Sequence, residues 1–279
     1  MSRPEVSVVL PAFNRGRDLM RAARSAIAQD VDLELVVVDD GSSPPVRLEF
    51  DDARARVVRL ERNQGPAAAR NAGVAAAAAG WLAFLDSDDT WPAGSLAPRL
   101  EAARGAADPA SVIWSGGFID VRGGARGRAR IPRASAAASD FAAGCWTCPG
   151  STALLSRAAW ERSGGQDAAL RRLEDYDWLL RWGLAGGRVD VHPTIAAEIT
   201  RHGRAAPEMV RAAAEAIRAK HAGLAAPLQT RMRSYLSLEI GAALLHAGAP
   251  FSGAAALAQS WVLRPRLQPA LERFWRAPD

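Results

Sequence analysis

Residues 34–42 read Glu34-Leu-Val-Val-Val-Asp-Asp-Gly-Ser42, an apolar run that stops at two aspartates. A short, continuous apolar run that ends in turn residues is typical of a strand buried on both faces. The pattern recurs at residues 81–85, where the apolar run is followed by Asp86-Ser87-Asp88-Asp89. The two segments therefore predict buried strands whose carboxyl ends carry clustered carboxylates.

The segments around these strands alternate between strand and helix patterns. Residues 6–10 and 56–60 are further apolar runs, and residues 18–29 and 65–79 have a helix-like composition. Strand, helix and strand in this order and spacing imply right-handed crossovers. We therefore predict an α/β fold with a mostly parallel sheet between helices.

The composition excludes some broad classes of protein. The chain has 279 residues, of which 49% are hydrophobic and 23% charged, the balance of an ordinary globular protein. Its net charge of +5 comes from 35 basic and 30 acidic residues, and Lys220 is the only lysine. An arginine bias accompanied by much alanine and glycine reflects genome composition rather than a nucleic-acid surface. We expect no nucleic-acid partner.

Several common motifs are absent from the sequence. No two glycines lie two positions apart, which excludes the G-x-G-x-x-G fingerprint, and no P-loop, H-E-x-x-H pair or G-x-S-x-G elbow occurs. The longest apolar stretch, residues 74–85, is shorter than the roughly 20 residues that span a bilayer, and no signal peptide is recognisable. We expect a cytoplasmic protein, with peripheral contact to the inner face of the membrane as an open alternative.

The aspartate clusters predict a ligand site. In an open α/β sheet the carboxyl ends of the strands border the ligand crevice, and like charges gathered there require a compensating cation. Asp86 and Asp88 are two residues apart, so in an extended chain both project to one side and could bind Mg²⁺ or Mn²⁺. The alternative is that the aspartates only stabilise turns and helix ends, as Asp89 would if it capped a helix starting near Ala93.

Six segments follow one another in an order that resembles a known family. The first four are residues 6–15 (VSVVLPAFNR), 34–42 (ELVVVDDGS), 63–73 (NQGPAAARNAG) and 84–89 (FLDSDD), and the last two are residues 173–181 (LEDYDWLLR) and 199–203 (ITRHG). Over about residues 4–205 the chain resembles the inverting glycosyltransferases of family 2, which have the GT-A fold. The resemblance implies a GT-A catalytic domain at residues 1–205 and a C-terminal helical extension at residues 206–279.

The resemblance places a donor site at the ends of the first strands. It implies that the nucleotide-sugar is bound by Pro11, Ala12, Phe13, Arg15, Asp39, Asp40, Asn63, Arg70, Asp86 and Ser87. Residues 11–13 would form the wall of the nucleoside pocket, and Asp40 would accept a hydrogen bond from the base or the ribose. Two alternatives stay open: Phe13 could be a core residue, and Arg70 could pair with an aspartate and hold the sheet edge together.

The same resemblance implies a metal site. Asp88, with Asp86 and His202, would hold Mn²⁺ or Mg²⁺, which would offset the charge developing on the departing diphosphate. A lone histidine is also an ordinary surface or core residue. Residues 199–200 are Ile and Thr, where the family often has an aromatic side chain.

The resemblance also implies a general base. Inversion requires the acceptor hydroxyl to attack from the face opposite the diphosphate, and a carboxylate there can take the hydroxyl proton. Asp175 matches that role, with Glu174 as the second candidate. The alternative is that an acidic pair at the start of a helix only compensates the helix dipole.

These assignments lead to one expected function and two alternatives. We expect a glycosyltransferase that moves a sugar from a nucleotide-diphosphate donor, which we expect to be a UDP-sugar, to a hydroxyl of a glycan or lipid-linked acceptor. A nucleotidyltransferase that forms nucleotide-sugars would instead have a glycine-rich basic loop after the first strand, where this chain has Pro11-Ala-Phe-Asn-Arg15. A non-catalytic nucleotide-sugar binding module would have no need of a base such as Asp175.

Two segments of the middle region remain outside these motifs. Residues 119–148 are rich in glycine, alanine and arginine, which predicts a mobile, solvated loop on the acceptor side, with binding of a phosphate-bearing or acidic acceptor as the alternative. Cys145 and Cys148 form a C-x-x-C pair without the second pair that zinc requires, so we expect ordinary buried thiols.

The last part of the chain has a helical pattern broken by prolines. Residues 208–222, 228–246 and 253–261 are the expected helices, separated at Pro227 and Pro250. We expect them to pack on the catalytic domain or to form a homodimer. Binding to a membrane surface beside a lipid-linked acceptor is the other open role.

Overall fold

The computed structural model describes residues 3–201, 203, 205–264 and 275–276. The strands are β1 (Val6–Ala12), β2 (Leu33–Asp39), β3 (Ala55–Arg59), β4 (Trp81–Phe84), β5 (Val112–Arg122), β6 (Ala125–Pro132), β7 (Leu154–Ser156), β8 (Arg188–Thr200) and β9 (Trp275–Arg276). The helices are α1 (Arg17–Ile27), α2 (Pro66–Ala76), α3 (Ala97–Arg104), α4 (Ala138–Phe141), α5 (Pro149–Thr152), α6 (Arg157–Ser163), α7 (Glu174–Leu184), α8 (Pro207–Lys220), α9 (Ala226–His246) and α10 (Pro250–Leu263). A 3₁₀ turn, Pro109–Ser111, precedes β5.

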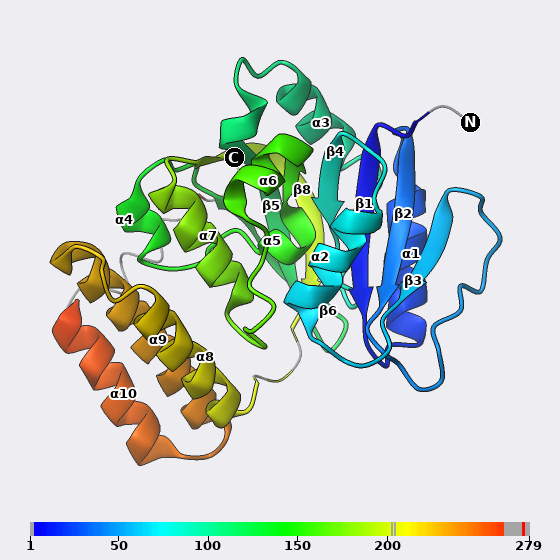
Figure 1. Ribbon diagram of the computed structural model, residues 1–279. Helices are drawn as coiled ribbons and strands as arrows, with labels where there is room; N and C mark the ends of the chain where they lie inside the picture. The colour runs from blue at the N-terminus through cyan, green and yellow to red at the C-terminus, as the bar shows by residue number, and fades with distance from the viewer. Residues whose placement is uncertain (1–2, 202, 204, 265–274, 277–279) are drawn as a thin grey trace.

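The first four strands form the parallel half of the sheet, as predicted. Their order is β3-β2-β1-β4, and β1 is buried along its whole length. Helix α1 covers one face and α2 covers the other (Figure 1). The close packing of α2 on the sheet requires glycine at position 73, where a Cβ atom would lie 2.3 Å from Val9 Cγ1 and 2.9 Å from Val38 Cγ2. The parallel half therefore brings the ends of β1, β2 and β4 to one edge.

The second half of the sheet is mixed. The three-residue strand β7 pairs antiparallel with both β4 and β5, whereas β8 runs parallel to β5. The prediction of a mostly parallel sheet thus holds for the first half, while antiparallel pairs enter through β6, β7 and β9. A strand as short as β7 offers too few residues for a periodic pattern to indicate it.

The prediction of a mobile loop over residues 119–148 is wrong for its first part. Residues 119–132 complete β5 and form β6, an antiparallel hairpin that turns at Gly123 and Gly124. Both glycines have positive φ, 54° and 84°, the geometry of the tight turns that suit hairpin twist. In the sequence, the adjacent glycines indicate this hairpin turn, but the many arginines around them favoured the interpretation as a solvated loop.

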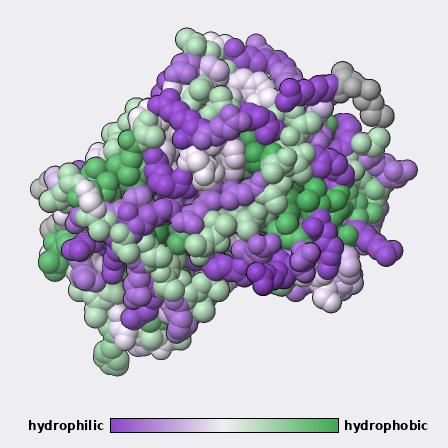
Figure 2. All heavy atoms as spheres, in the orientation of Figure 1, coloured by the Kyte–Doolittle hydropathy of each residue, from purple (hydrophilic) through white to green (hydrophobic). Residues whose placement is uncertain are grey.

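The predicted C-terminal helices are present as α8, α9 and α10, with shifted ends. Helix α7 lies between them and the sheet (Figure 1), and Tyr176 of α7 stacks on Tyr235 of α9 with ring centroids 4.5 Å apart. These contacts fit the expected packing on the catalytic domain, while the boundary at residues 205/206 stays a prediction. Over the face in Figure 2, hydrophilic and apolar residues are intermixed on these helices. Among the described helices, none combines the length and the apolar character needed to cross a bilayer.

Candidate active site

The predicted motifs at residues 70, 86 and 174–175 meet around one guanidinium group. Arg70, on α2 and 2% exposed, donates from Nη2 to Asp86 Oδ1 at 2.6 Å. Its Nη1 lies 3.2 Å from Glu174 Oε1 and 3.2 Å from Asp175 Oδ1. Burial alone would lower the pKa of Arg70, but the carboxylates of Asp86, Asp175 and Glu174 raise it above its ordinary value. Arg70 therefore stays charged between the two acidic motifs, which was the open alternative to a direct phosphate contact.

Asp175 lies in the first turn of α7 with one carboxylate oxygen anchored. Its Oδ1 accepts hydrogen bonds from Gln166 Nε2 at 3.0 Å and from Arg70 Nη1, and its side chain is 26% exposed. Within the described part of the chain, the hydrogen bonds to this carboxylate all end on Oδ1. Burial, together with the Glu174 and Asp86 carboxylates and against the effect of Arg70, raises the pKa of Asp175 to about 7. The group is thus a carboxyl whose ionisation falls near neutral pH.

Gln166 joins this cluster although no sequence motif marks it. It is 4% exposed, and its Oε1 accepts from Arg70 Nη1 at 3.0 Å while its Nε2 donates to Asp175. The Asn71 side chain fixes its backbone, donating to Gln166 O at 2.8 Å and accepting from Gln166 N at 3.1 Å. Consecutive residues of α2 thereby hold the loop that orients the carboxylate of α7.

A second unpredicted feature is the close approach of α5 to the same cluster. A Cβ atom at Gly150 would lie 2.5 Å from Asp86 Oδ2 and 2.7 Å from Arg70 Nη2. Neighbouring Ser151 accepts a hydrogen bond from Asp86 N at 3.1 Å. The segment between β6 and β7 therefore presses on the Arg70–Asp86 pair, and only glycine leaves room for it.

Asp88 lies beside Arg15, also as a charged pair. The Arg15 Nη2 atom is 3.2 Å from Asp88 Oδ2, and the two side chains are 38% and 20% exposed. The backbone oxygen of Asp88 accepts from Arg21 Nη2 and from Thr200 Oγ1 at 2.6 Å. The start of the late histidine motif thus lies against the aspartates that follow β4, while His202 itself lies outside the described residues.

The donor set fits a hard divalent cation only in part. Among the described residues, the four carboxylates of Asp86, Asp88, Glu174 and Asp175 pair with two arginines, Arg15 and Arg70. Among the described residues, no group of three His, Cys, Asp or Glu is arranged to hold a metal. Mg²⁺ and Mn²⁺ accept such sites, because they keep several waters and take oxygens from substrate phosphates. The residues therefore fit a cation held by one or two carboxylates together with a bound diphosphate.

Asp89 does not cap a helix near Ala93, so the predicted helix cap is wrong. Helix α3 begins at Ala97, and Asp89 is 4% exposed, where it accepts from Ser151 Oγ at 2.5 Å and from Thr200 N at 2.7 Å. Burial and the neighbouring Asp86 and Asp88 charges raise the pKa of its carboxyl well above the ordinary value. Asp89 joins the end of β4 to α5 and to the end of β8.

The aspartates after β2 are bound to the backbone of adjacent loops. Asp40 is 3% exposed and accepts from Gln64 N at 2.7 Å and Gly65 N at 2.8 Å. Asp39 is fully buried; it accepts from Ser42 N at 2.8 Å and Val46 N at 3.0 Å, and it also pairs with an arginine of β3. A carboxylate has about four acceptor positions, so a nucleoside contact by Asp40 would use those that remain.

The other predicted donor residues are divided between the core and the surface. Pro11 and Ala12 are buried, whereas Phe13 is 44% exposed, so the ring is not a core residue. Asn63 is half-buried and accepts from the Arg171 guanidinium, and Ser87 is 7% exposed. The exposed ring beside a buried strand end keeps Phe13 available for a planar ligand.

A carboxylate that the sequence analysis did not single out forms a second charged cluster on α7. Asp177 is fully buried and accepts from Arg181 Nε at 2.9 Å and Lys220 Nζ at 2.9 Å, while its Oδ1 lies 2.9 Å from His221 Nε2. Burial would raise its pKa, but these hydrogen bonds and the Arg181 charge lower the pKa of Asp177 to about 2. The chain's only lysine thus fastens α8 to α7, and the four-residue spacing of Asp177 and Arg181 was the available signal.

The two cysteines are free thiols. Burial raises the pKa of both, that of Cys148 to about 11, although Arg201 Nη2 lies 3.4 Å from Cys148 Sγ. Each is half-buried rather than fully buried. A raised thiol pKa keeps both in the weakly nucleophilic form, in keeping with the expectation of ordinary thiols.

Comparison with protein families gives one match over more than half of the chain. The family model described as Glycosyl transferase family 2 matches residues 7–163. This segment runs from the second residue of β1 past β7 and includes the aspartates that follow β2 and β4.

Curated relatives match shorter stretches. Over 104 residues, 36% of this chain and 30% of the relative, the chain is 44% identical to the succinoglycan biosynthesis protein ExoO of Rhizobium meliloti. Over 99 residues, 34% of this chain and 39% of the relative, it is 38% identical to the UDP-Glc:alpha-D-GlcNAc-diphosphoundecaprenol beta-1,3-glucosyltransferase WfgD of Escherichia coli. Over 208 residues, 69% of this chain, it is 31% identical to the pre-mycofactocin glycosyltransferase of Mycobacterium tuberculosis. The matched stretches make up less than half the length of each of these relatives, and 42% of the Mycobacterium tuberculosis protein.

Solved structures share the fold at low sequence identity. The crystal structure of S. aureus TarS aligns with a TM-score of 0.56 at 17% identity, over 96% of this chain and 55% of TarS. Its 1–349 fragment aligns with a TM-score of 0.53 at 16% identity, over 95% of this chain and 91% of the fragment. The arrangement of sheet and helices therefore extends beyond the matched segment to most of the chain.

Proposed function

The chain belongs to glycosyl transferase family 2 and has its GT-A fold, and on this premise we propose that it is an inverting glycosyltransferase. The donor is a nucleotide-diphosphate sugar, and we infer a UDP-sugar because the Escherichia coli relative is named for one. The acceptor is a hydroxyl of a glycan or lipid-linked sugar, in keeping with relatives named for succinoglycan biosynthesis and for a diphosphoundecaprenol-linked acceptor.

One observation carries this proposal: the Arg70 guanidinium contacts both Asp86, beside the metal motif, and Asp175, the predicted base. The residues lie 89 positions apart in the chain, yet their carboxylates are bound to opposite nitrogens of one group. A diphosphate held beside Asp86 and a hydroxyl held beside Asp175 would be neighbours, as transfer from one to the other requires.

Asp175 acts as the general base in this proposal. Its Oδ1 is anchored by Gln166 and Arg70, so Oδ2 is left to accept the proton of the acceptor hydroxyl. A base works best when its pKa lies near the working pH, and that of Asp175 is raised to about 7. Glu174, 7% exposed and bound to the same Nη1 of Arg70, assists by holding that arginine in place.

The donor lies along the ends of β1, β2 and β4. The exposed Phe13 ring beside buried Pro11 and Ala12 provides an apolar wall for the nucleoside. Asp40 holds the loop before α2 through two backbone amides and so positions Asn63. Arg15, paired with Asp88 in this structure, is placed to contact a diphosphate bound at that carboxylate.

Asp88 and Asp86 would hold a divalent cation, which when bound offsets negative charge on the departing diphosphate. Ser87 lies between them, and Asp89 fixes the ends of their loop through Ser151 and Thr200. The two carboxylates are thus held at the edge of the sheet by contacts of the protein itself.

A donor screen tests the proposal. We expect UDP-sugars to raise the melting temperature of the protein when Mn²⁺ or Mg²⁺ is present and not when it is removed by chelation. Asp88→Ala should abolish this metal-dependent shift, whereas Asp190→Asn, a change at a half-exposed carboxylate on β8, should keep it. Asp175→Asn should also keep the shift, because the base is not needed for donor binding.

Two results would contradict parts of the proposal. A wild-type protein that no UDP-sugar stabilises, with or without metal, would remove the assigned donor class. An Asp88→Ala variant that retains the full metal-dependent shift would show that the cation is held elsewhere.

A further inference from the structure

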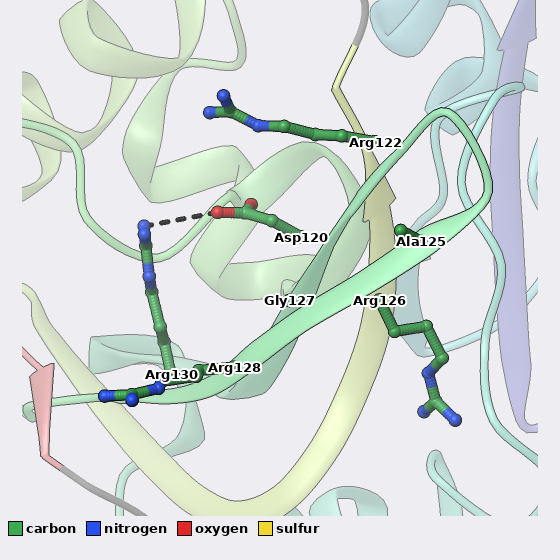
Figure 3. Close-up of a pocket in the computed structure, with 7 residues that line it drawn as sticks. All are labelled: Asp120, Arg122, Ala125, Arg126, Gly127, Arg128 and Arg130. Carbon is green, nitrogen blue, oxygen red and sulfur yellow. Dashed lines mark ion pairs between the residues drawn. The ribbon is translucent and has the colours of Figure 1, made fainter.

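The hairpin formed by β5 and β6 carries an open, arginine-rich groove outside the Arg70 cluster. This groove, the hairpin pocket, has a volume of about 410 Å³ and is lined by Asp120, Arg122, Ala125, Arg126, Gly127, Arg128 and Arg130. Figure 3 shows Asp120, Arg122 and Arg130 extending to one side of the hairpin, with Arg126 on the other side. The volume lies within the roughly 300–1,000 Å³ typical of small-molecule sites.

A β-bulge shapes this pocket. Ile119 pairs with Ala129, and Val121 pairs with Arg126, so three steps on β6 face two steps on β5. An extra residue in one strand re-aims the side chains that follow it. Arg126 is turned to Glu198 of β8, 2.8 Å away, while Arg130 pairs with Asp120 at 3.3 Å.

Positive charge dominates the pocket. Asp120 is shared between Arg130 and Arg201, whose Nε lies 2.7 Å from Asp120 Oδ1. Arg122 and Arg128 are exposed, and neither has an ion pair among the described residues. Among the described residues here, the two carboxylates of Asp120 and Glu198 pair with three of five arginines (Arg126, Arg130 and Arg201), which leaves Arg122 and Arg128 uncompensated. Guanidinium groups bind phosphate oxygens in a planar, paired geometry, so the pocket suits a phosphate or diphosphate.

The pocket is connected directly to the proposed metal motif. Arg201 N donates to Val121 O at 2.8 Å, and the preceding residue, Thr200, donates from its hydroxyl to Asp88 O and from its backbone to Asp89. In the sheet, β5 and β6 lie on the far side of β4 from β1 and β2. An anion in the hairpin pocket therefore lies near the loop of Asp88 and Asp89 and away from the strand ends assigned to the nucleoside.

We propose that the hairpin pocket binds the phosphate or diphosphate group of a phosphate-bearing acceptor, an inference that rests on the proposed transferase function. The pocket is a concave site with two arginines fixed on Asp120 and two more free to close on an anion. Binding the acceptor's phosphate here would leave its sugar hydroxyl to reach Asp175 across the Asp88 loop. The arginines thereby select acceptors that carry phosphate over neutral glycans.

The experiment measures binding of inorganic pyrophosphate by calorimetry without divalent metal. Arg122→Ala/Arg128→Ala should bind pyrophosphate roughly 10-fold more weakly than wild type, since two charge-assisted contacts are lost. The control is Arg211→Ala/Arg233→Ala, which removes two exposed arginines from α8 and α9 and should bind as wild type. Equal affinity in the hairpin variant and in wild type would overturn the proposal.

Two further measurements test whether the arginines bind something other than an acceptor phosphate. Vesicles of phosphatidylglycerol, compared with phosphatidylcholine, test whether the arginines recognise a membrane surface. If Arg122→Ala/Arg128→Ala loses binding to phosphatidylglycerol vesicles but keeps the pyrophosphate affinity of wild type, the acceptor assignment is overturned. The metal-dependent thermal shift with UDP-sugars should be the same in the hairpin variant as in wild type, and its loss would assign the pocket to the donor diphosphate instead. The pyrophosphate measurement needs no donor. If no UDP-sugar binds, that result therefore contradicts the proposed function, while the pyrophosphate affinities still test the hairpin pocket.

Discussion

Asp175 and Asp177 lie two residues apart in the first turn of α7, yet their surroundings are opposite in charge. Asp175 shares a single arginine with Asp86 and Glu174, and its pKa is raised to about 7. Asp177 is surrounded by Arg181, Lys220 and His221, and its pKa is lowered to about 2. One carboxylate is poorly compensated and partly exposed, and the other is fully compensated and buried.

Helical geometry explains how neighbours acquire such different roles. Residues two apart on an α-helix are separated by roughly 200° around its axis, so they face different parts of the molecule. Asp175 faces α2 and the end of β4, whereas Asp177 faces α8. When the environments of two carboxyl groups drive their pKa values apart, the two groups can take different roles, one in proton transfer and one in stabilising the fold. The acidic motif therefore has one residue suited to proton transfer and one suited to holding the C-terminal helices.

The largest expected effect is on transfer. Asp175→Asn should lower kcat by roughly 10²–10⁴-fold, since an amide cannot accept the hydroxyl proton. Asp177→Asn should retain most of the specific activity of the folded protein, because Asp177 does not face the cluster. Sugar transfer measured with a UDP-sugar donor under saturating metal checks both, and normal transfer by Asp175→Asn would remove the base assignment.

The next effect is on stability, and here the Asp177 variant is expected to be affected rather than the Asp175 variant. Asp177→Asn should lower the free energy of unfolding by about 3 kcal/mol at pH 7, because three cationic or polar partners lose their buried carboxylate. Asp175→Asn should not lower it, since its folded-state pKa is raised and its charge is a cost to folding at neutral pH. Urea unfolding of both variants at pH 7 makes the measurement.

Acid conditions provide the control for this stability difference. The folded-state pKa of Asp177 is lowered to about 2, so its stabilising contribution is present above pH 4 and is lost as the pH falls through about 2. The contribution from ionisation is about 2 kcal/mol. The gap between wild type and Asp177→Asn should therefore shrink by this amount from pH 5 to pH 2, and a constant gap would mean that packing rather than charge is lost.

A third effect concerns the pH dependence of activity. With the pKa of Asp175 at about 7, the base is protonated below that pH, so kcat/KM should fall about tenfold per pH unit on the acid side. Above pH 7 the profile should level off. The residual activity of Asp175→Asn should lack this step, and an identical step in that variant would assign the titration to another group.

The sequence predicts the parallel half of the sheet and the residues of its edge, because long apolar runs and clustered aspartates are local signals. Val6–Ala12 and Leu33–Asp39 form strands close to the expected positions. The pairing of Arg70 with an aspartate of the sheet edge was one of the two roles considered for that arginine, but its contact with Asp175 on α7 was not predicted. The position of His202 is not described, so its proposed metal contact stays a prediction.

Other parts of the site depend on contacts that no local pattern records. Gly150 is required by two side chains, Asp86 after β4 and Arg70 on α2, which only the folded chain brings against α5. The hairpin at Gly123 and Gly124 was obscured by arginines whose partners, Asp120 and Glu198, come from two different strands. Such features arise from long-range packing, so periodicity and spacing cannot predict them.

The smallest effect tests whether Gln166 tunes the base rather than merely packing beside it. Gln166→Met keeps the volume but removes the hydrogen bond to Asp175 Oδ1, which lowers the pKa of that carboxyl. The pKa of Asp175 should therefore rise, and the midpoint of the kcat/KM profile should move by roughly half a pH unit to the alkaline side. Gln259→Met, at an exposed glutamine on α10, should leave the midpoint unchanged. A purely structural role would lower kcat equally at all pH values. An unmoved midpoint in Gln166→Met would therefore place this glutamine outside proton transfer. Arg70 would then be the hydrogen-bond donor that sets the pKa of Asp175 apart from that of Asp177.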